Sequence, residues 1–264
     1  MSDTGRIVAV TGASSGIGLA AARLFRDRGD KVYCLSRTDP KEPGITFIYT
    51  DVTDEASVNA AFGAIGKAEG RIDVLLSNAG IGVSGAAECT TMQDAKRQLD
   101  VNFFGLHACV RAAVPLMRAN GGTILATSSV AAVFAIPFQA FYSASKFAVN
   151  ALVLALANEL KPFNIHVAAI MPGDVKTGFT GARVKAARDD NYGQSVEKSV
   201  AVMERDEQNG MGPEMIAKKF VALSLKKHPK VLSTVGLQYK FFCFLGKVLP
   251  IRLQNFIVGK MYIK

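Results

Sequence analysis

Near the start of this 264-residue chain the sequence reads Thr11-Gly-Ala-Ser-Ser-Gly-Ile-Gly18, directly after an apolar run at residues 7–10. Glycine lets the backbone turn tightly and approach a phosphate closely, and the N–H groups at the start of a following helix attract its charge. The spacing is G-x3-G-x-G, which differs from the G-x-G-x-x-G of the common fingerprint. A strand, a glycine turn and a helix in this order predict the first unit of a parallel α/β sheet.

Apolar runs of strand length alternate with stretches of helix length along the chain. The predicted strands are residues 7–10, 31–35, 45–49, 74–77, 122–128 and 165–171, and the predicted helices are residues 17–28, 55–69, 92–119 and 142–161. This alternation indicates right-handed crossovers and a parallel sheet that helices cover on both faces. No linker or repeat divides the sequence, so we expect one α/β domain over residues 1–264.

The positive charge is concentrated in the last third of the chain. Residues 1–180 carry a net charge of +1 and residues 181–264 a net charge of +8, and ten Lys or Arg but no acidic residue follow Glu214. These cations alternate with apolar residues instead of clustering, which argues against nucleic acid as a partner. The pattern favours an anionic lipid surface or an anionic substrate.

The cysteine residues and the hydropathy of the chain indicate its cellular compartment. The four cysteines (Cys34, Cys89, Cys109 and Cys243) lack the paired spacing of a metal site, as do the three histidines, so we predict no metal centre. Free thiols in apolar runs indicate a reducing compartment. No apolar stretch reaches the roughly 18 residues of a membrane span. We expect a cytoplasmic location, with membrane association through the C-terminal segment left open.

The residues after the second predicted strand bear on cofactor choice. An acidic side chain at this place commonly holds the ribose of NAD. Here the strand at residues 31–35 continues with Ser36 and Arg37. A hydroxyl and a guanidinium suit the 2′-phosphate of NADP. We therefore predict NADP(H).

Tyr142 and Lys146 lie four residues apart, on one face of the predicted helix. A lysine ammonium beside a phenol favours the phenolate and lowers the tyrosine pKa. Such a pair also occurs by chance on ordinary helices. Ser129, just past a predicted strand, and Asn102 favour a catalytic role for Tyr142 and Lys146.

With these residues in place, the chain resembles the short-chain dehydrogenase/reductase family from about residue 5 to Thr177, in an NADP-preferring, hydroxysteroid dehydrogenase-like form. The matching pieces, in order, are residues 11–18, Asp51-Val52, Asn78-Ala79-Gly80, Asn102, Ser129, Tyr142-Ser-Ala-Ser-Lys146 and Pro172-Gly-Asp-Val-Lys-Thr177. The resemblance implies a single Rossmann-type doubly wound domain, a parallel sheet flanked by helices, with a C-terminal helical extension.

The resemblance also implies a role for each matched polar residue. Tyr142 would donate a proton to a carbonyl oxygen or remove one from an alcohol. Ser129 would hydrogen-bond that oxygen, and Lys146 would bind the nicotinamide ribose and lower the Tyr142 pKa. Asn102 would hold a water that links Lys146 to solvent.

Further positions follow from the same resemblance. The residues expected at the cofactor are Gly12, Ser14, Ser15, Gly16, Ile17, Gly18, Ser36, Arg37, Asp51, Val52, Asn78, Ala79, Gly80, Tyr142, Lys146, Pro172, Gly173, Val175 and Thr177. Those expected at the substrate are Ser129, Tyr142 and Phe138, the last within an apolar wall of Val133, Phe134, Ile136, Pro137, Phe138 and Phe141. Residues 1–177 would form the cofactor-binding and catalytic core, and residues 178–214 a substrate lid.

Residues 215–264 depart from the pattern of many tetrameric members. We expect neither the final strand nor the short Val-Asp-Gly-Gly-like tail of those proteins. The segment is instead basic and rich in phenylalanine (Phe220, Phe241, Phe242, Phe244 and Phe256). Two interpretations stay open: helices that pack on the domain or on a second subunit, and a surface that touches lipid. The resemblance implies a homodimer or homotetramer.

The sequence thus predicts an NADP(H)-dependent oxidoreductase that interconverts a secondary alcohol and a ketone. A lipophilic, hydroxysteroid or bile-acid-like substrate is the leading class, and the basic C-terminal segment favours an anionic one. The alternatives are a 3-oxoacyl thioester reductase and a non-catalytic NADP(H)-binding sensor or scaffold.

Overall fold

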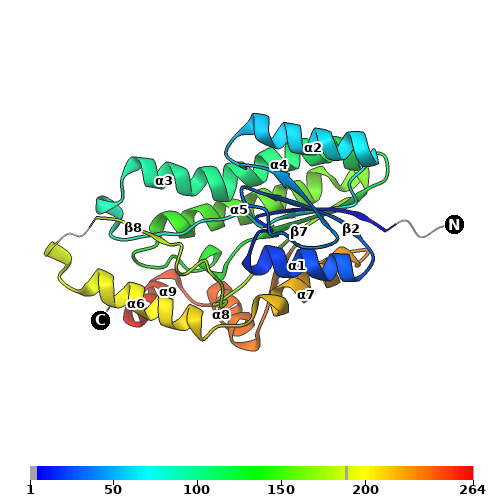
Figure 1. Ribbon diagram of the computed structural model, residues 1–264. Coiled ribbons are helices and arrows are strands. Elements are labelled where there is room, and N and C mark those ends of the chain that lie inside the picture. Colours follow the sequence, from blue (N-terminus) through cyan, green and yellow to red (C-terminus); the bar gives the residue numbers. More distant parts are fainter. Residues whose placement is uncertain (1–4, 188–189, 264) are drawn as a thin grey trace.

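A computed structural model describes residues 5–187 and 190–263. Within these residues seven parallel strands form the central sheet in the order β3-β2-β1-β4-β6-β7-β9 (Figure 1). The strands are β1 (Ile7–Thr11), β2 (Lys31–Ser36), β3 (Ile45–Tyr49), β4 (Val74–Ser77), β6 (Gly122–Thr127), β7 (Ile165–Met171) and β9 (Leu232–Thr234). The chain winds outward from β1 to β3 and then returns to β4 on the other side of β1. This reversal opens a crevice at the carboxyl ends of β1 and β4.

Helices cover both faces of the sheet (Figure 1). One face packs against α1 (Gly16–Asp27) and α7 (Pro213–Ser224), and the other against α2 (Glu55–Glu69), α4 (Gly105–Met117) and α5 (Ala140–Glu159). Successive residues of a strand point to opposite faces. In β1, Val8 and Val10 belong to the hydrophobic core under α1 and α7. Ile7 and Ala9 belong to the core under α2, α4 and α5. Burial on both faces explains why the strands read as continuous apolar runs.

The predicted α/β fold is confirmed, and the six predicted strands agree with the structure to within one residue at one end. The predicted helix at residues 92–119 is wrong in one respect. It divides into α3 (Met92–Leu99), a π-helical turn (Asp100–Phe104) and α4. The π-turn covers only Asp100–Phe104 within a long helical segment, so hydropathy over a window of helix length does not show it.

The C-terminal region corrects a second expectation. A short final strand is present, because β9 pairs in parallel with the end of β7. Two helices follow it, α8 (Leu237–Val248) and α9 (Ile251–Tyr262). They lie with α6 (Ser195–Gln208) beyond the carboxyl ends of the strands (Figure 1). A small parallel pair, β5 (Val83–Ser84) and β8 (Val184–Lys185), ties the segment before α6 to the domain.

Among the described residues, α5 is the one helix long and apolar enough by composition to cross a membrane. Its position explains this composition. Val149 and Val153 are buried in the core under the sheet, and the first turns of the helix carry Tyr142 and Lys146. The helix is apolar because it is the central helix of one face.

Candidate active site

Polar side chains join the ends of β1, β4 and β6 at the crevice. The hydroxyl oxygen of Thr11 accepts hydrogen bonds from the backbone N–H groups of Asn78 (2.9 Å) and Ala79 (3.1 Å). The amide of Asn78 donates to the Gly12 carbonyl at 3.2 Å and accepts from the Thr127 hydroxyl at 3.0 Å. Three strand ends are therefore held at fixed separation around the crevice.

The glycines of the first turn allow this close approach. Gly12 has φ of 62°, and a Cβ there would lie 2.8 Å from the Cα of Ala79. A Cβ at Gly18 would lie 2.6 Å from the side-chain nitrogen of Asn78. Gly18 therefore serves packing and does not line the cavity, whereas Gly12 and Gly16 do. Side chains would push α1 away from the strand ends.

The start of α1 faces the crevice with free donors. The first N–H groups of a helix lack partners inside it, and the side chain of the N-cap residue Ser15 makes no capping hydrogen bond. Ser14, Ser15 and Ile17 line the same cavity. The arrangement suits an anionic pyrophosphate, because backbone donors and the positive end of the helix point toward it.

Ser36 and Arg37 lie where the second strand ends at the cavity. The Ser36 hydroxyl donates to the Thr38 carbonyl at 2.7 Å, while Arg37 is exposed. On the next strand end, burial tends to raise the pKa of Asp51, but hydrogen bonds from Thr53 outweigh this and the pKa is lowered. Asp51 is thus held as an anion near the exposed Arg37 guanidinium, which also lowers its pKa.

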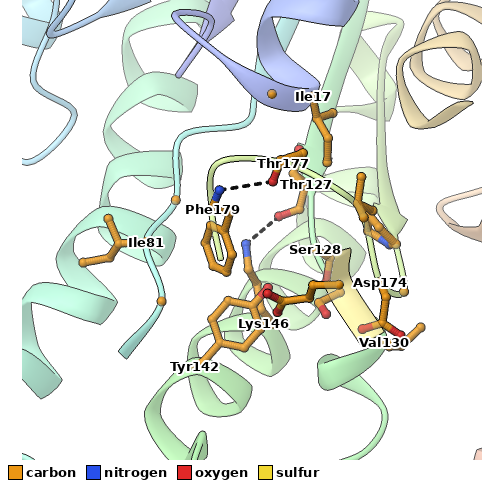
Figure 2. A pocket seen from close by; sticks show the side chains of 18 of the residues that line it. Ile17, Ile81, Thr127, Ser128, Val130, Tyr142, Lys146, Asp174, Thr177 and Phe179 are labelled. Carbon is orange, nitrogen blue, oxygen red and sulfur yellow. Dashed lines mark hydrogen bonds between the residues drawn. The ribbon is translucent and has the colours of Figure 1, made fainter. Parts of the chain in front are cut away.

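Tyr142 and Lys146 project from one face of α5 into the cavity, side by side (Figure 2). The Lys146 ammonium lies 5.7 Å from the centre of the Tyr142 ring and donates to the Thr127 carbonyl at 2.8 Å. Ser129 faces Tyr142 from the end of β6, and its hydroxyl accepts the Ala131 N–H at 3.1 Å. The four-residue spacing on α5 places the phenol and the ammonium as predicted.

Burial dominates the ionisation of this pair. It raises the pKa of Tyr142 to about 12, against a smaller opposite effect of the Ser129 hydrogen bond. It also lowers the pKa of Lys146 to about 8, because the charged ammonium is removed from water. The direction of the Tyr142 pKa shift is opposite to the one the sequence predicts, because burial of the phenol is the largest effect on it.

Asn102 lies beneath Lys146 and does not line the cavity. Its side chain accepts the Ile81 N–H at 2.9 Å, and donates to the Ile81 carbonyl at 3.1 Å and to the Ser145 hydroxyl at 3.0 Å. A Cβ at Gly80 would lie 3.3 Å from the Asn102 oxygen and 3.8 Å from the Lys146 nitrogen. The π-turn directs Asn102 inward, where it holds the loop that passes under the lysine.

The loop after β7 is fastened by the C-terminal helices. Tyr239 of α8 accepts the Asp174 N–H at 3.0 Å and donates to the Asp174 carboxylate at 2.6 Å. A methyl group at Gly173 would collide with the Tyr239 ring. Burial is the main cause that raises the pKa of both Asp174 and Tyr239, the latter to about 12. The loop that carries Pro172 to Thr177 is therefore set by a residue about 65 positions away.

The segment predicted as a lid begins over the tyrosine. The ring of Phe179 lies 5.9 Å from the ring of Tyr142, and Figure 2 shows the two facing each other. Farther along, the buried Arg183 pairs with Glu207 of α6, which also accepts from the Thr180 hydroxyl at 2.6 Å. The start of the segment is thus anchored to α6.

One cavity of about 1130 Å³ runs from the first glycine turn past Tyr142 and Lys146 to α8 and α9. The expected site residues that line it are Gly12, Ser14, Ser15, Gly16, Ile17, Ser36, Arg37, Asp51, Val52, Asn78, Ala79, Gly80, Ser129, Tyr142, Lys146, Pro172, Gly173, Val175 and Thr177. Phe138 is not among the lining residues. Its backbone has φ of 59° and its ring packs edge-on against Tyr192, 5.9 Å away. Of the expected apolar wall, only Phe134 and Ile136 face the cavity.

The larger apolar wall comes from residues that the sequence analysis did not assign to the site. They are Phe179, Phe242 and Leu245 of α8, Leu249 directly after α8, and Ile257, Val258 and Met261 of α9. Residues 242, 245 and 249 follow the spacing of one helical face, so the amphipathic pattern of α8 was the available signal. It does not reveal which surface that face covers.

Comparison with known proteins agrees with this geometry. The family model for short chain dehydrogenase matches residues 6–188. The chain belongs to the short-chain dehydrogenase/reductase family. Members are oxidoreductases that bind nicotinamide cofactors.

Individual relatives span most of the chain. The chain is 38% identical over 236 residues to a 3-ketodihydrosphingosine reductase of Bacteroides thetaiotaomicron, covering 88% of each. It is 38% identical to mouse 17-beta-hydroxysteroid dehydrogenase type 1, covering 66% of this chain and 55% of that protein. A crystal structure of a short-chain dehydrogenase from Streptomyces avermitilis has a TM-score of 0.86 at 27% identity, covering 98% of each chain.

The Tyr239–Asp174 contact can be tested by stability. Tyr239→Phe removes a hydrogen bond to a carboxylate and one from a backbone N–H, both partly buried. We expect a loss of about 2 kcal/mol in the free energy of unfolding and a fall of roughly 5 °C in Tm. Thermal and urea unfolding followed by circular dichroism measure both. Tyr49→Phe, whose side chain is 59% exposed, is the matched control. Equal Tm values for the two variants would show that the contact contributes nothing.

Proposed function

We propose that this short-chain dehydrogenase/reductase reduces a lipophilic ketone with NADPH in the cytoplasm. The observation that carries the proposal is the position of Tyr142. It lies with Ser129 and Lys146 in a cavity whose outer wall is built from apolar side chains of α8 and α9. Bound NADP(H) would supply or accept the hydride.

The protein's own residues would handle the carbonyl oxygen. The Tyr142 hydroxyl donates the proton, and the Ser129 hydroxyl hydrogen-bonds the same oxygen and orients it. Lys146 holds positive charge beside the phenol, which favours release of its proton at the moment of transfer. Phe179 covers the tyrosine ring and excludes water from that side.

The ionisation of Tyr142 suits its role as the acid when a ketone is reduced. Because burial raises its pKa to about 12, the phenol keeps its proton throughout the physiological range. A group that is protonated before the reaction is ready to act as an acid.

The lining of the cavity favours a long-chain ketone, because the apolar side chains of Phe179, α8 and α9 form its outer wall. Each of the three carboxylates at the cavity has a partner: Asp174 accepts from Tyr239, Asp206 pairs with Arg205 and Glu207 pairs with Arg183. 3-Ketodihydrosphingosine, the substrate named for the Bacteroides thetaiotaomicron relative, is a long-chain ketone with an amino group next to the carbonyl. A substrate of that class suits the apolar wall, and a hydroxysteroid is the second candidate because of the mouse relative.

Substrate choice and the catalytic role can be tested together. NADPH consumption is measured with a long-chain 2-amino-3-ketone, keto steroids, a keto bile acid and an acetoacetyl thioester. We expect the amino ketone to give the highest kcat/KM. Tyr142→Phe should lower kcat by about 10²–10⁴-fold and leave NADPH binding, followed by fluorescence, unchanged. Turnover confined to the thioester, or an unchanged rate in the variant, would refute the proposal.

NADP preference rests on Ser36 and Arg37, with no carboxylate at the strand end. Arg37→Ala should weaken NADPH binding by about tenfold, through loss of a charge-assisted contact to the 2′-phosphate, and leave NADH binding unaltered. Isothermal titration of both cofactors measures this. Arg28→Ala, an exposed arginine outside the cavity, is the control. Equal losses of affinity for NADPH and NADH would show that Arg37 does not contact the 2′-phosphate.

Reduction should depend on pH through Lys146. Its pKa of about 8 makes it the first of the pair to lose a proton as the pH rises, because Tyr142 holds its own to about 12. The ammonium is present below pH 8 and absent above it, so kcat/KM for reduction should be level at lower pH and fall about tenfold per pH unit above. A profile that stays level to about pH 10 would contradict this role.

A further inference from the structure

The C-terminal hairpin of α8 and α9 has an apolar outer face as well as an apolar inner one. Gln254 joins the two helices, because its amide donates to the carbonyls of Gly246 (3.1 Å) and Leu249 (2.7 Å). The inner face lines the cavity. The large hydrophobic side chains of this region that are exposed by 43–84% and do not line the cavity, which we call the hairpin surface, are Leu237, Phe241, Phe244, Val248, Ile251, Leu253, Phe256 and Ile263.

On α8 the hairpin surface is an ordered stripe. Leu237, Phe241, Phe244 and Val248 follow the spacing of one helical face. An apolar stripe this continuous on an outer face marks an interaction site, since isolated exposed hydrophobic residues are common but contiguous ones are not. The same helix turns Phe242 and Leu245 inward to the cavity.

The charges of the hairpin identify the partner. Lys240 and Lys247, seven residues apart, border the α8 stripe on one side, and Arg252 and Lys260 lie on α9; all four are exposed. The Lys260 ammonium lies 5.7 Å from the centre of the Phe256 ring. No acidic residue occurs after Glu214. A second copy of this surface would therefore bring cations together with no carboxylate of the hairpin to neutralise them, which argues against self-association.

Mixed apolar and basic side chains suit the boundary of an anionic bilayer. Phenylalanine, isoleucine and leucine enter the acyl region, while lysine and arginine reach the phosphate groups from long flexible stems. Each cation near such a surface adds about 1 kcal/mol of attraction. The stripe and its bordering lysines have this arrangement.

We infer that the hairpin surface docks on an anionic lipid bilayer, and that the lipophilic substrate passes from the bilayer into the cavity between α8 and α9. The docking step stands on the exposed side chains and charges alone. The entry step rests on the proposed function, since it needs a substrate that partitions into lipid. In this arrangement the two helices alone separate the bilayer from the cavity. A substrate that leaves the bilayer therefore has to move past the thickness of one helix layer to reach the cavity.

Docking is tested by sedimentation of the full chain with vesicles. One set contains phosphatidylglycerol and the other is pure phosphatidylcholine. We expect binding to the anionic set, weakened by added salt, and at least about tenfold less to the neutral one. The double variants Phe241→Gln/Phe244→Gln and Lys240→Glu/Lys247→Glu should each lower binding by about tenfold or more.

Matched controls separate the hairpin surface from general effects. Tyr49→Gln/Met92→Gln removes two exposed hydrophobic side chains far from the hairpin in sequence, with exposures of 59% and 70%. Lys67→Glu/Lys96→Glu reverses two exposed charges, so its net charge equals that of the hairpin charge variant. Both controls should bind vesicles as the unmodified protein does.

Three results would overturn docking. The first is equal binding to neutral and anionic vesicles. The second is an equal loss of vesicle binding in a hairpin variant and in its matched control. The third is a dimer in light scattering that Phe241→Gln/Phe244→Gln dissociates, with no vesicle binding, because the surface would then join two copies of the chain.

Entry from the bilayer has its own readout. Phe241 and Phe244 do not line the cavity. Phe241→Gln/Phe244→Gln should therefore lower the rate with a long-chain ketone embedded in anionic vesicles by about tenfold, and leave unchanged the rate with a short water-soluble ketone. Equal rates with the embedded ketone would overturn entry. Vesicle binding without reduction of any ketone would instead refute the proposed function while docking stands, and Tyr142→Phe should bind vesicles normally.

Discussion

The site depends on a polar tie at the carboxyl ends of three strands. The Thr11 hydroxyl holds the backbone of Asn78 and Ala79, and the Asn78 amide reaches both the Gly12 carbonyl and the Thr127 hydroxyl. This network sets how far β1, β4 and β6 stand apart where the strand order reverses. Thr127 in turn offers its carbonyl to Lys146. The phosphate cradle and the proton-transfer group are therefore positioned by one set of hydrogen bonds.

Glycine is required at this tie for reasons of volume. Side chains at Gly12 and Gly18 would overlap the neighbouring strand end and the Asn78 amide. The start of α1 can then approach the strands closely enough for its free N–H groups to face the crevice. Both close packing and the binding of a phosphate thus require glycine at these positions.

The second half of the site is built by long-range contacts. Tyr239 of α8 sets the loop at Asp174, and Phe242 of the same helix belongs to the cavity wall. Helix α8 therefore fixes the loop, lines the cavity and presents an apolar stripe on the outer surface. If that stripe lies on a bilayer, the surface that binds lipid and the wall that meets a lipophilic substrate are two faces of one element.

The sequence alone determined the elements whose signals are local. The alternation of strand and helix, the glycine turn and the four-residue spacing of Tyr142 and Lys146 depend on neighbouring residues and so appear in the pattern. The tertiary structure was needed to reveal the π-turn at Asn102, the final strand, the position of Phe138 away from the cavity lining and the wall from α8 and α9. The raised pKa of Tyr142 belongs here too, because burial depends on what distant segments cover the ring. Such features come from contacts between residues far apart in the chain, and hydropathy does not encode which partner an apolar face will meet.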